Sequence, residues 1–426
     1  MKSLLVLIVP ALSAFADDAA AVRRDLAKER AALGARCEEA GLVEEAAREW
    51  QAARREDPAV AGAAEALARI GKPWVLEWDE ALHANFVAYA KDRSALLDRF
   101  AARWLALGDA RSALTLSPDF EPAHDRAGEV FAGGEWVRRE VADFLLQDLL
   151  PIDGKWLPAA DVKKRRAAWA EAWEIRGTHF AVRSNRSEPA AREVLALAEA
   201  VFAAVHRELE GELDAPAPKK RFAVYDFATR ADFLAHLDAV HEGGAERRSS
   251  AGFFSSLDAA SHFAPTGNGF GLGDPDVVRH EVAHQVCDAL WPPQGMLAER
   301  PHFWAWEGVA AFFESTKIRD GKILVGSRLH PRMGMARGAL KDGATLPLDE
   351  FVLLDGEGVK GRYNQAASLV HFFLLSDGGK GRERFLKYLR VVASGKAEAD
   401  TFEKSFGCKA GKFQEDWEAW VKGSGR

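Results

Sequence analysis

The sequence predicts an α+β fold in which an all-α N-terminal region precedes a region built from a small mixed sheet and further helices. Three observations lead to this prediction. The chain has 426 residues, nearly three times the ~150 of a typical domain, so two or three domains are expected. Residues 19–71 are rich in Ala, Arg, Glu and Leu with apolar residues at helical spacing. From Thr178 onwards, short alternating segments typical of strands appear between helical stretches.

The composition indicates a globular protein and excludes several classes of function. Hydrophobic residues make up 48% of the chain and charged residues 28%, which is ordinary for a protein with a packed core. The net charge of −7 disfavours nucleic-acid binding, which needs a strongly basic face. Three cysteines are too few for a disulfide framework. Beyond Asp17 no apolar stretch approaches the ~20 residues of a membrane span, so none is expected.

The first sixteen residues have the pattern of a secretory signal peptide. Lys2 supplies the positive start, Leu4 to Val9 is a short apolar run, and Ala14-Phe15-Ala16 has the form of a cleavage site. A buried N-terminal helix is the alternative, but Pro10 and the acidic start of the mature chain count against it. We therefore expect cleavage after residue 16 and a secreted or periplasmic protein.

Residues 17–175 are predicted to form a helical region. Leu33-Gly34, Gly41, Ala46, Trp50 and Pro58 follow the order of a tetratricopeptide helix-turn-helix, and a partial second copy runs from Trp104 to Phe131. The segment resembles tetratricopeptide repeats, and we expect it to dock a protein partner or to shield the cleft of the second domain. Two shorter echoes follow, Gly134-Glu135-Trp136-Val137 and Gly154-Lys155-Trp156-Leu157, which we interpret as tight turns whose Trp packs back on the helices.

Residues 176–426 are expected to form the second domain, with its sheet in 176–273 and mostly helices in 274–426. Strands are predicted at 179–183, 221–227, 251–256 and 262–264, separated by helices at 187–213 and from Thr229 to about His241. The Gly-rich segment 265–273 lacks the Lys-Ser/Thr ending of a phosphate-binding loop, so we interpret it as a flexible loop.

A histidine pair on a predicted helix carries the chemistry. The helix is expected over 275–291, with Asp274 as its N-cap and Pro292-Pro293 after its end. His280 and His284 are four residues apart, so their imidazoles project from one face and can bind one Zn²⁺. Glu281 is offset by about 100° and can act on a water as general base.

A second helix supplies a third ligand. In the segment from Trp304 to Glu314, the charged residues are Glu307 and Glu314, seven apart on an otherwise apolar helix. Acidic residues seldom lie on such a face without a partner, and a metal provides one. Glu307 is therefore predicted to complete a two-His, one-Glu site, and Glu314 to orient a ligand His. A buried ion pair and a structural salt bridge are the respective alternatives.

The residues His280-Glu281-Val282-Ala283-His284-Gln285, with Trp306-Glu307-Gly308 and Glu314, resemble the gluzincin metallopeptidases. This clan contains thermolysin and the zinc aminopeptidases, and the similarity is greatest to the bacterial peptidase MA-like group, over roughly residues 178–426. The resemblance implies a zinc peptidase with a thermolysin/aminopeptidase-like catalytic domain. By analogy with the aminopeptidase branch, it also implies that Tyr363, at the start of a helix, stabilises the oxyanion; a plain helix-start aromatic is the alternative.

Several residues depart from the pattern or leave choices open. The Gly-Ala-Met-Glu-Asn exopeptidase signature is missing, so endo- or exopeptidase action stays open. His302 is a weaker alternative ligand. His371 could serve the site, but we expect it to be a core histidine. Cys287 is expected to be a packing residue, and the sequence does not determine whether it forms a disulfide with Cys408. We expect an exported zinc metalloprotease acting on peptides. The alternative is a tetratricopeptide-type scaffold with a zinc-bound but inactive domain.

Overall fold

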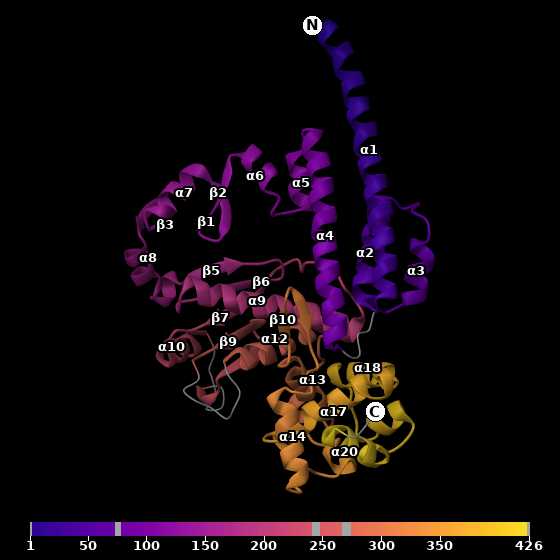
Figure 1. The fold of residues 1–426 in the computed structure, drawn as a ribbon. Coiled ribbons are helices and arrows are strands. Elements are labelled where there is room, and N and C mark those ends of the chain that lie inside the picture. The colour runs from indigo at the N-terminus through magenta and orange to yellow at the C-terminus, as the bar shows by residue number, and fades with distance from the viewer. Residues whose placement is uncertain (1, 73–77, 241–247, 266–273, 424–426) are drawn as a thin grey trace. The chain divides into compact units, whose positions relative to one another are not determined.

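The protein is α+β, with 61% helix and 11% strand. The computed structural model describes residues 2–72, 78–240, 248–265 and 274–423 (Figure 1). Most of the Gly-rich segment expected to be a loop therefore lies outside the described residues. The chain forms two compact units, Met1–Val162 and Lys163–Arg426. The division precedes the expected boundary because Trp173–Arg176 is a strand of the second unit's sheet.

The first unit begins with helices that pack as antiparallel pairs. α1 and α2 form one such pair, and α4 and α5 another. The helices are α1 (Lys2–Glu39), α2 (Val43–Glu56), α3 (Ala63–Ile70), α4 (Glu80–Ala106), α5 (Ala110–Leu116) and α6 (Glu121–Ala127).

Small residues allow α1 and α2 to approach closely. Gly41 turns the chain between them with a φ of 76°, which favours glycine. A Cβ on Gly34 would lie 3.1 Å from the Trp50 indole nitrogen, so this glycine makes room for the ring. Ala46 and Ala53 are fully buried in the same core. Gly34 and Trp50 therefore meet where α1 and α2 cross, and Gly41 turns the chain between the two helices.

The expectation of an all-α N-terminal region is wrong in one respect, because two β-hairpins follow α6. They are β1 (Glu129–Ala132) with β2 (Glu135–Arg138), and β3 (Leu149–Ile152) with β4 (Lys155–Pro158), each followed by a helix, α7 (Arg139–Leu146) or α8 (Ala159–Arg166). The two similar segments 134–137 and 154–157 form the end of each hairpin turn and the start of its second strand. Their tryptophans do pack back on helices, Trp136 on His124 and Trp156 on Phe144.

The second unit is organised around one five-stranded mixed sheet in the order β5-β6-β7-β9-β8. β6, β7 and β9 are parallel, and β5 and β8 pair antiparallel at the two edges. The strands are β5 (Trp173–Arg176), β6 (Phe180–Ser184), β7 (Phe222–Asp226), β8 (Gly252–Ser255) and β9 (Ala260–Phe263).

Helices cover both faces of this sheet. α9 (Glu188–Val205), continued by a π-helical turn over His206–Glu210, and α12 (Asp274–Leu290) pack together on one face. α10 (Arg230–Val240) lies on the other face, where Phe233 and Leu237 form a small core with Phe253. Gln285 ties α12 to the sheet, because its amide donates to the carbonyls of Ala223 (3.0 Å) and Ala259 (2.7 Å).

The rest of the second unit is mainly helical. Its elements are α13 (Trp304–Phe313), the hairpin β10 (Lys317–Arg319) and β11 (Lys322–Leu324), α14 (Pro331–Lys341), α15 (Leu348–Phe351), α16 (Gly356–Val359), α17 (Tyr363–Leu375), α18 (Arg382–Ala393), α19 (Thr401–Phe406) and α20 (Gln414–Lys422). Short 3-10 turns lie at Trp169–Glu171, Leu297–Glu299, Ser376–Gly379 and Ala410–Phe413. Aromatic rings of Trp304, Phe373, Phe385 and Tyr388 pack in its core.

A buried ion network joins the sheet part of this unit to its helical part. Glu208, in the π-helical turn after α9, accepts from Arg207 and from Arg382 of α18, both at 2.8 Å. All three side chains are almost fully buried, and each charge has an opposite partner.

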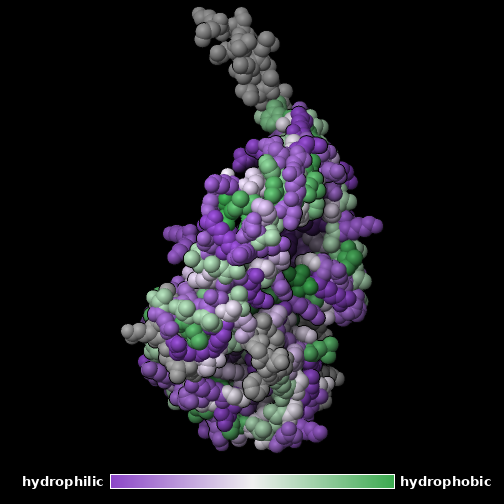
Figure 2. All heavy atoms as spheres, turned by 90° about the vertical axis from the view of Figure 1, so that its left-hand side faces the viewer, coloured by the Kyte–Doolittle hydropathy of each residue, from purple (hydrophilic) through white to green (hydrophobic). Residues whose placement is uncertain are grey.

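One face of the molecule is seen in Figure 2, coloured by hydropathy. On the face in Figure 2, the hydrophobic residues form small, separate patches between hydrophilic ones. Large hydrophobic side chains with high exposure are scattered over both units and include Phe131, Leu146, Leu257 and Leu329. Among the residues the structure describes, no helix is both long and apolar enough to cross a membrane.

Candidate metal centre

α12 presents both histidines of the motif to one point. His280 and His284 are one helical turn apart, and their Nε2 atoms lie 3.2 Å from each other. Both side chains are about nine-tenths buried. The Trp306 ring stacks near His284, with ring centroids 5.6 Å apart and an interplanar angle of 21°. The histidines therefore face an enclosed site rather than bulk solvent.

α13 brings Glu307 to the same point. Its Oε2 atom lies 3.2 Å from His280 Nε2 and 3.5 Å from His284 Nε2. The position of α13 depends on a close helix crossing, because a Cβ on Gly308 would lie 2.8 Å from the Ala366 carbonyl oxygen of α17. Only a glycine allows the two helices to approach so closely. In this arrangement the neighbouring Glu307 faces α12.

The three atoms have the separations expected of metal ligands. Donors held ~2.05 Å from an ion at the corners of a tetrahedron lie ~3.3 Å apart. The observed separations are 3.2, 3.2 and 3.5 Å. His280 donates through Nδ1 to Glu314, so in its neutral form Nε2 carries a lone pair directed at the other two atoms. A cation satisfies all three acceptors at once, so His280, His284 and Glu307 fit a metal ion.

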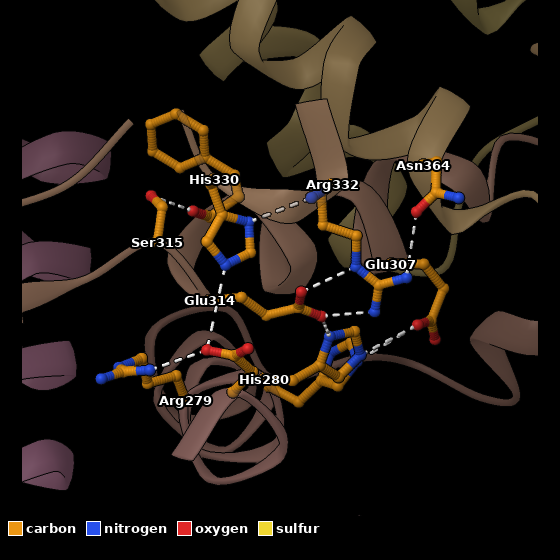
Figure 3. A network of polar contacts seen from close by, with 11 residues as sticks. Arg279, His280, Glu307, Glu314, Ser315, His330, Arg332 and Asn364 are labelled. Atoms are coloured by element: carbon orange, nitrogen blue, oxygen red, sulfur yellow. Dashed lines mark hydrogen bonds and ion pairs between the residues drawn. The ribbon is translucent and has the colours of Figure 1, made fainter. Parts of the chain in front are cut away.

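Glu314 contacts the ring nitrogen of His280 that faces away from Glu307, and Arg332 contacts Glu314 in turn (Figure 3). Glu314 Oε1 accepts from His280 Nδ1 at 2.8 Å. Both carboxylate oxygens of Glu314 also accept from Arg332, each at 2.7 Å. Glu314 therefore lies where the sequence predicts an orienting carboxylate, and Arg332 holds it by a two-pronged ion pair.

The electrostatics of the centre favour positive charge. Burial lowers the pKa of His280, but hydrogen bonds to Glu307 and Glu314 outweigh it and raise this pKa to about 10. Burial raises the pKa of Glu307, but the His284 charge and hydrogen bonds to both imidazoles hold it well below its usual range. The pKa of Glu314 is lowered in the same way by His280 and Arg332. Both carboxylates therefore stay ionised at neutral pH.

Glu281 lies beside the three converging side chains but is not one of them. Its Oε2 atom accepts a hydrogen bond of 2.8 Å from the backbone N–H of Phe254 in edge strand β8. The offset along α12 turns it away from Glu307 and towards the sheet, as the helical spacing predicts. One carboxylate thus joins the histidines while the other remains available for proton transfer.

A cavity of about 510 Å³ opens at this centre. Its walls come from β8 and the residues before it, from α12 and α13, and from Arg332 and Tyr363. The size is in the range of small-molecule or peptide-side-chain sites. The cavity combines the three converging side chains, the Glu281 carboxylate and the β8 strand in one space.

Tyr363, at the start of α17, lies at the same cavity. Its ring centroid is 6.2 Å from that of His280. Burial first, and then the negative charges of Glu307 and Glu281, raise the pKa of its phenol. The phenol therefore keeps its proton at neutral pH and can act as a hydrogen-bond donor.

The other histidines and cysteines singled out in the sequence lie elsewhere. His302 is fully buried and its Nε2 contacts the Glu398 carbonyl, so it is not a ligand. His371 is also buried and has hydrogen bonds at both ring nitrogens. Cys287 is buried and Cys408 partly so, and both are free thiols.

Sequence reasoning did not find Arg332, Asn364 or the Phe254 N–H. Arg332 lies in a short helix whose sequence has no motif, and the signal that could have pointed to it is the need of buried Glu314 for a cation. The Phe254 contact is made by the backbone, which no residue type reveals.

Comparisons with known proteins add nothing to this geometry. No protein-family model matches the chain, and no curated protein matches it either.

Proposed function

We propose that the protein is a zinc-dependent peptidase, with His280, His284 and Glu307 as the residues that would hold the ion. The observation that carries the proposal is the convergence of these three side chains next to a fourth residue, Glu281, that stays outside the set. Two imidazoles and one carboxylate are the donors of catalytic rather than structural zinc sites. A zinc ion bound there would supply Lewis acidity and lower the pKa of a water to ~7.

Glu281 is assigned the role of general base. Its carboxylate lines the same cavity as the three converging residues and accepts a hydrogen bond from the backbone N–H of Phe254. It can take a proton from the attacking water and pass it to the leaving amine. General acid–base catalysis of this kind contributes ~10²–10⁴ in rate.

Tyr363 is assigned the role of oxyanion donor. A protonated phenol can donate to the oxygen that develops negative charge when water attacks the scissile carbonyl. The position of Tyr363 supports this role, because it lines the cavity and its ring centroid is 6.2 Å from that of His280. The resemblance to the aminopeptidase branch points to the same residue.

An extended peptide is the substrate form that the cavity suits best. Among the described residues, β8 is an edge strand with β9 on one side, and Gly252, Phe253 and Phe254 line the cavity. The free edge of a strand can pair with an added strand through backbone hydrogen bonds. A peptide paired with β8 would lie next to Glu281, whose carboxylate accepts from the Phe254 N–H of this strand.

The test compares Glu281→Gln with the wild type in zinc content and in cleavage of casein and a quenched peptide library. We expect both proteins to bind one zinc, and the variant to lose ~10²–10⁴ of the wild-type rate. Glu383→Gln, the same change at an exposed position of α18, is the matched control and should keep full activity. Zinc bound without cleavage by the wild type would favour the scaffold function, and a protein that binds no zinc would rule out both.

We also propose export with cleavage after Ala16. The support is the order of a positive residue, an apolar run and Ala14-Phe15-Ala16 in the sequence. N-terminal sequencing of protein recovered outside the cytoplasm should give a chain beginning at Asp17; recovery of a chain that retains Met1 would contradict this.

A further inference from the structure

Arg332 contacts two parts of the candidate centre that come from different helices. Its Nε and Nη2 atoms donate to the two carboxylate oxygens of Glu314 in the segment after α13, each at 2.7 Å. Its Nη1 atom donates to Asn364 Oδ1 of α17 at 3.3 Å. The guanidinium carbon also lies 5.8 Å from the centroid of the Tyr363 ring. Figure 3 shows Arg332 between Glu314 and Asn364.

These contacts are made in a poorly solvated place. The side chain of Arg332 is 13% exposed and that of Glu314 is 1% exposed. A buried ion pair with two parallel hydrogen bonds holds both groups in one orientation, and only a guanidinium has this geometry. Because Glu314 also accepts from His280 Nδ1, the orientation passes directly to the imidazole that faces Glu307.

The backbone of Arg332 is fixed at the start of its own helix, α14. Its N–H donates to His330 Nδ1, which caps the start of α14, at 3.4 Å. His330 Nε2 in turn lies 3.9 Å from Asp276 of α12, whose Oδ1 accepts from Arg279 at 2.8 Å. At 3.9 Å the His330–Asp276 approach is too long for a hydrogen bond. The hydrogen-bonded link from Arg332 to α12 therefore runs through its side chain, by way of Glu314 and His280.

We propose that Arg332 is a positioning residue that couples the orientation of the ligand His280 to that of Tyr363. It acts on His280 through Glu314, and on Tyr363 through the ring contact and the adjacent Asn364. The proposal rests on the proposed function for the role of Tyr363, but its effect on metal binding does not depend on catalysis. One guanidinium would set both the metal affinity and the position of the oxyanion donor.

The first test measures zinc affinity by competition with a chromogenic chelator. Arg332→Lys keeps the positive charge but cannot make the two-pronged pair, and we expect the zinc Kd to rise ~10–100-fold. The visible absorption of the cobalt-substituted protein should change as well, because it reports ligand geometry. Arg337→Gln, on the same helix and away from the cavity, should leave both readouts unchanged. An unchanged Kd and spectrum in Arg332→Lys would overturn the proposal.

Glu314→Gln provides a second variant that leaves Arg332 and His280 in place. It should raise the zinc Kd like Arg332→Lys, and combining the two changes should add little, because both break one link. Fully additive effects on Kd would contradict a shared path through Glu314. If Arg332→Lys fails to fold, Arg332→Gln takes its place in both zinc measurements, with the same expected and contradicting outcomes.

The second test is a double-mutant cycle with Tyr363→Phe, measured as kcat at saturating zinc. In the wild type the loss of the phenol should lower kcat strongly, whereas in Arg332→Lys the same change should cost several-fold less. Equal costs in both backgrounds would show that Arg332 does not position Tyr363. If the wild type cleaves no peptide, the proposed function fails, and the zinc and cobalt measurements still decide the metal part of the proposal.

Discussion

At the scale of single residues, the centre assigns different tasks to side chains of one chemical type. Glu281, Glu307 and Glu314 all line one cavity, yet each carboxylate has different partners. Glu307 faces two imidazole nitrogens, Glu314 holds an imidazole and a guanidinium, and Glu281 contacts a backbone N–H. The partners, rather than the residue type, indicate which carboxylate binds a cation, which orients and which transfers a proton.

His371 is buried in one fixed neutral form. Its Nδ1 accepts from the Trp420 indole at 3.0 Å, and its Nε2 donates to the Gly326 carbonyl at 2.9 Å. Burial, followed by the nearby Arg328 charge, lowers the pKa of His371 to about 4. The residue therefore has a structural rather than a catalytic role, and it links α17 to α20 and to the segment before α14.

This lowered pKa predicts a loss of stability in acid. The folded protein resists protonation of His371, whereas the unfolded chain takes up the proton at a pKa of ~6.5. The free energy of unfolding is therefore unaffected above this pKa and falls as the pH drops from ~6.5 towards 4, by up to about 3 kcal/mol. His371→Gln keeps one donor and one acceptor but cannot titrate. Urea unfolding between pH 7 and 4 should show a shallower loss for the variant. Parallel curves for the two proteins would contradict the prediction.

At the scale of secondary-structure elements, the centre depends on how α13 crosses α17. Gly308 is the contact point, since an added Cβ would lie 2.8 Å from both the Ala366 carbonyl oxygen and Val370 Cγ2. The preceding residue, Glu307, faces α12, and Tyr363 begins the helix on the other side of the crossing. One close packing contact therefore sets the relative position of a candidate ligand and the candidate oxyanion donor.

Gly308→Ala should destabilise the protein by about 1–3 kcal/mol, because the helices must separate to admit the methyl group. It should also weaken zinc binding by displacing Glu307. Gly338→Ala, in α14, is the matched control: nothing lies within 4 Å of its added Cβ, so a stability gain of about 0.5–1 kcal/mol is expected from helix propensity. Thermal unfolding and zinc titration of both variants check this, and equal behaviour would refute the packing argument.

The two hairpins of the first unit are copies of one supersecondary element. Trp136 and Trp156 are equivalent (156 − 136 = 20), and so are the residues on which they stack, His124 and Phe144 (144 − 124 = 20). The helices that follow, α7 and α8, begin with the same offset (159 − 139 = 20). A left-handed residue precedes each first strand, Gly128 or Asp148. The repeat unit is therefore a hairpin and a helix, distinct from the helical pairs before it.

At the scale of the whole molecule, the candidate metal centre lies entirely within the second of the two units. The first unit has its own hydrophobic core around residues such as Leu26, Trp50 and Phe100. The second unit contains all three candidate ligands, Glu281, and the residues that support them. Each unit is compact by itself, so we expect each to unfold as a separate cooperative unit.

Zinc should accordingly stabilise one unit and leave the other unchanged. Calorimetry of the full chain should show two transitions, and only that of residues 163–426 should move upwards on adding zinc, by several degrees at 100 times Kd. Glu307→Gln should abolish the shift without moving the other transition. A single transition that shifts as a whole would show that the units unfold together.

The fold was predictable where the pattern is long and regular. α12 and α13 follow from apolar spacing and from helix-ending residues such as Pro292, and the alternation at β6 and β7 identifies strands. β5 and the hairpin strands were missed. Each has four residues with at most one of them fully buried, so burial imposes little pattern on them, whereas β8 and β9 are equally short but almost wholly buried. The all-α prediction for the first region failed for this reason.

Within the candidate centre, a single helical turn is enough to bring His280 and His284 to one face and to turn Glu281 aside, because these positions depend only on the 3.6-residue period. Which distant carboxylate meets them is a matter of packing between helices. The approach at Gly308, the Arg332–Glu314 pair and the Phe254 N–H all join segments far apart in the chain. Such contacts depend on how the helices and the sheet pack, and local spacing carries no information about that packing.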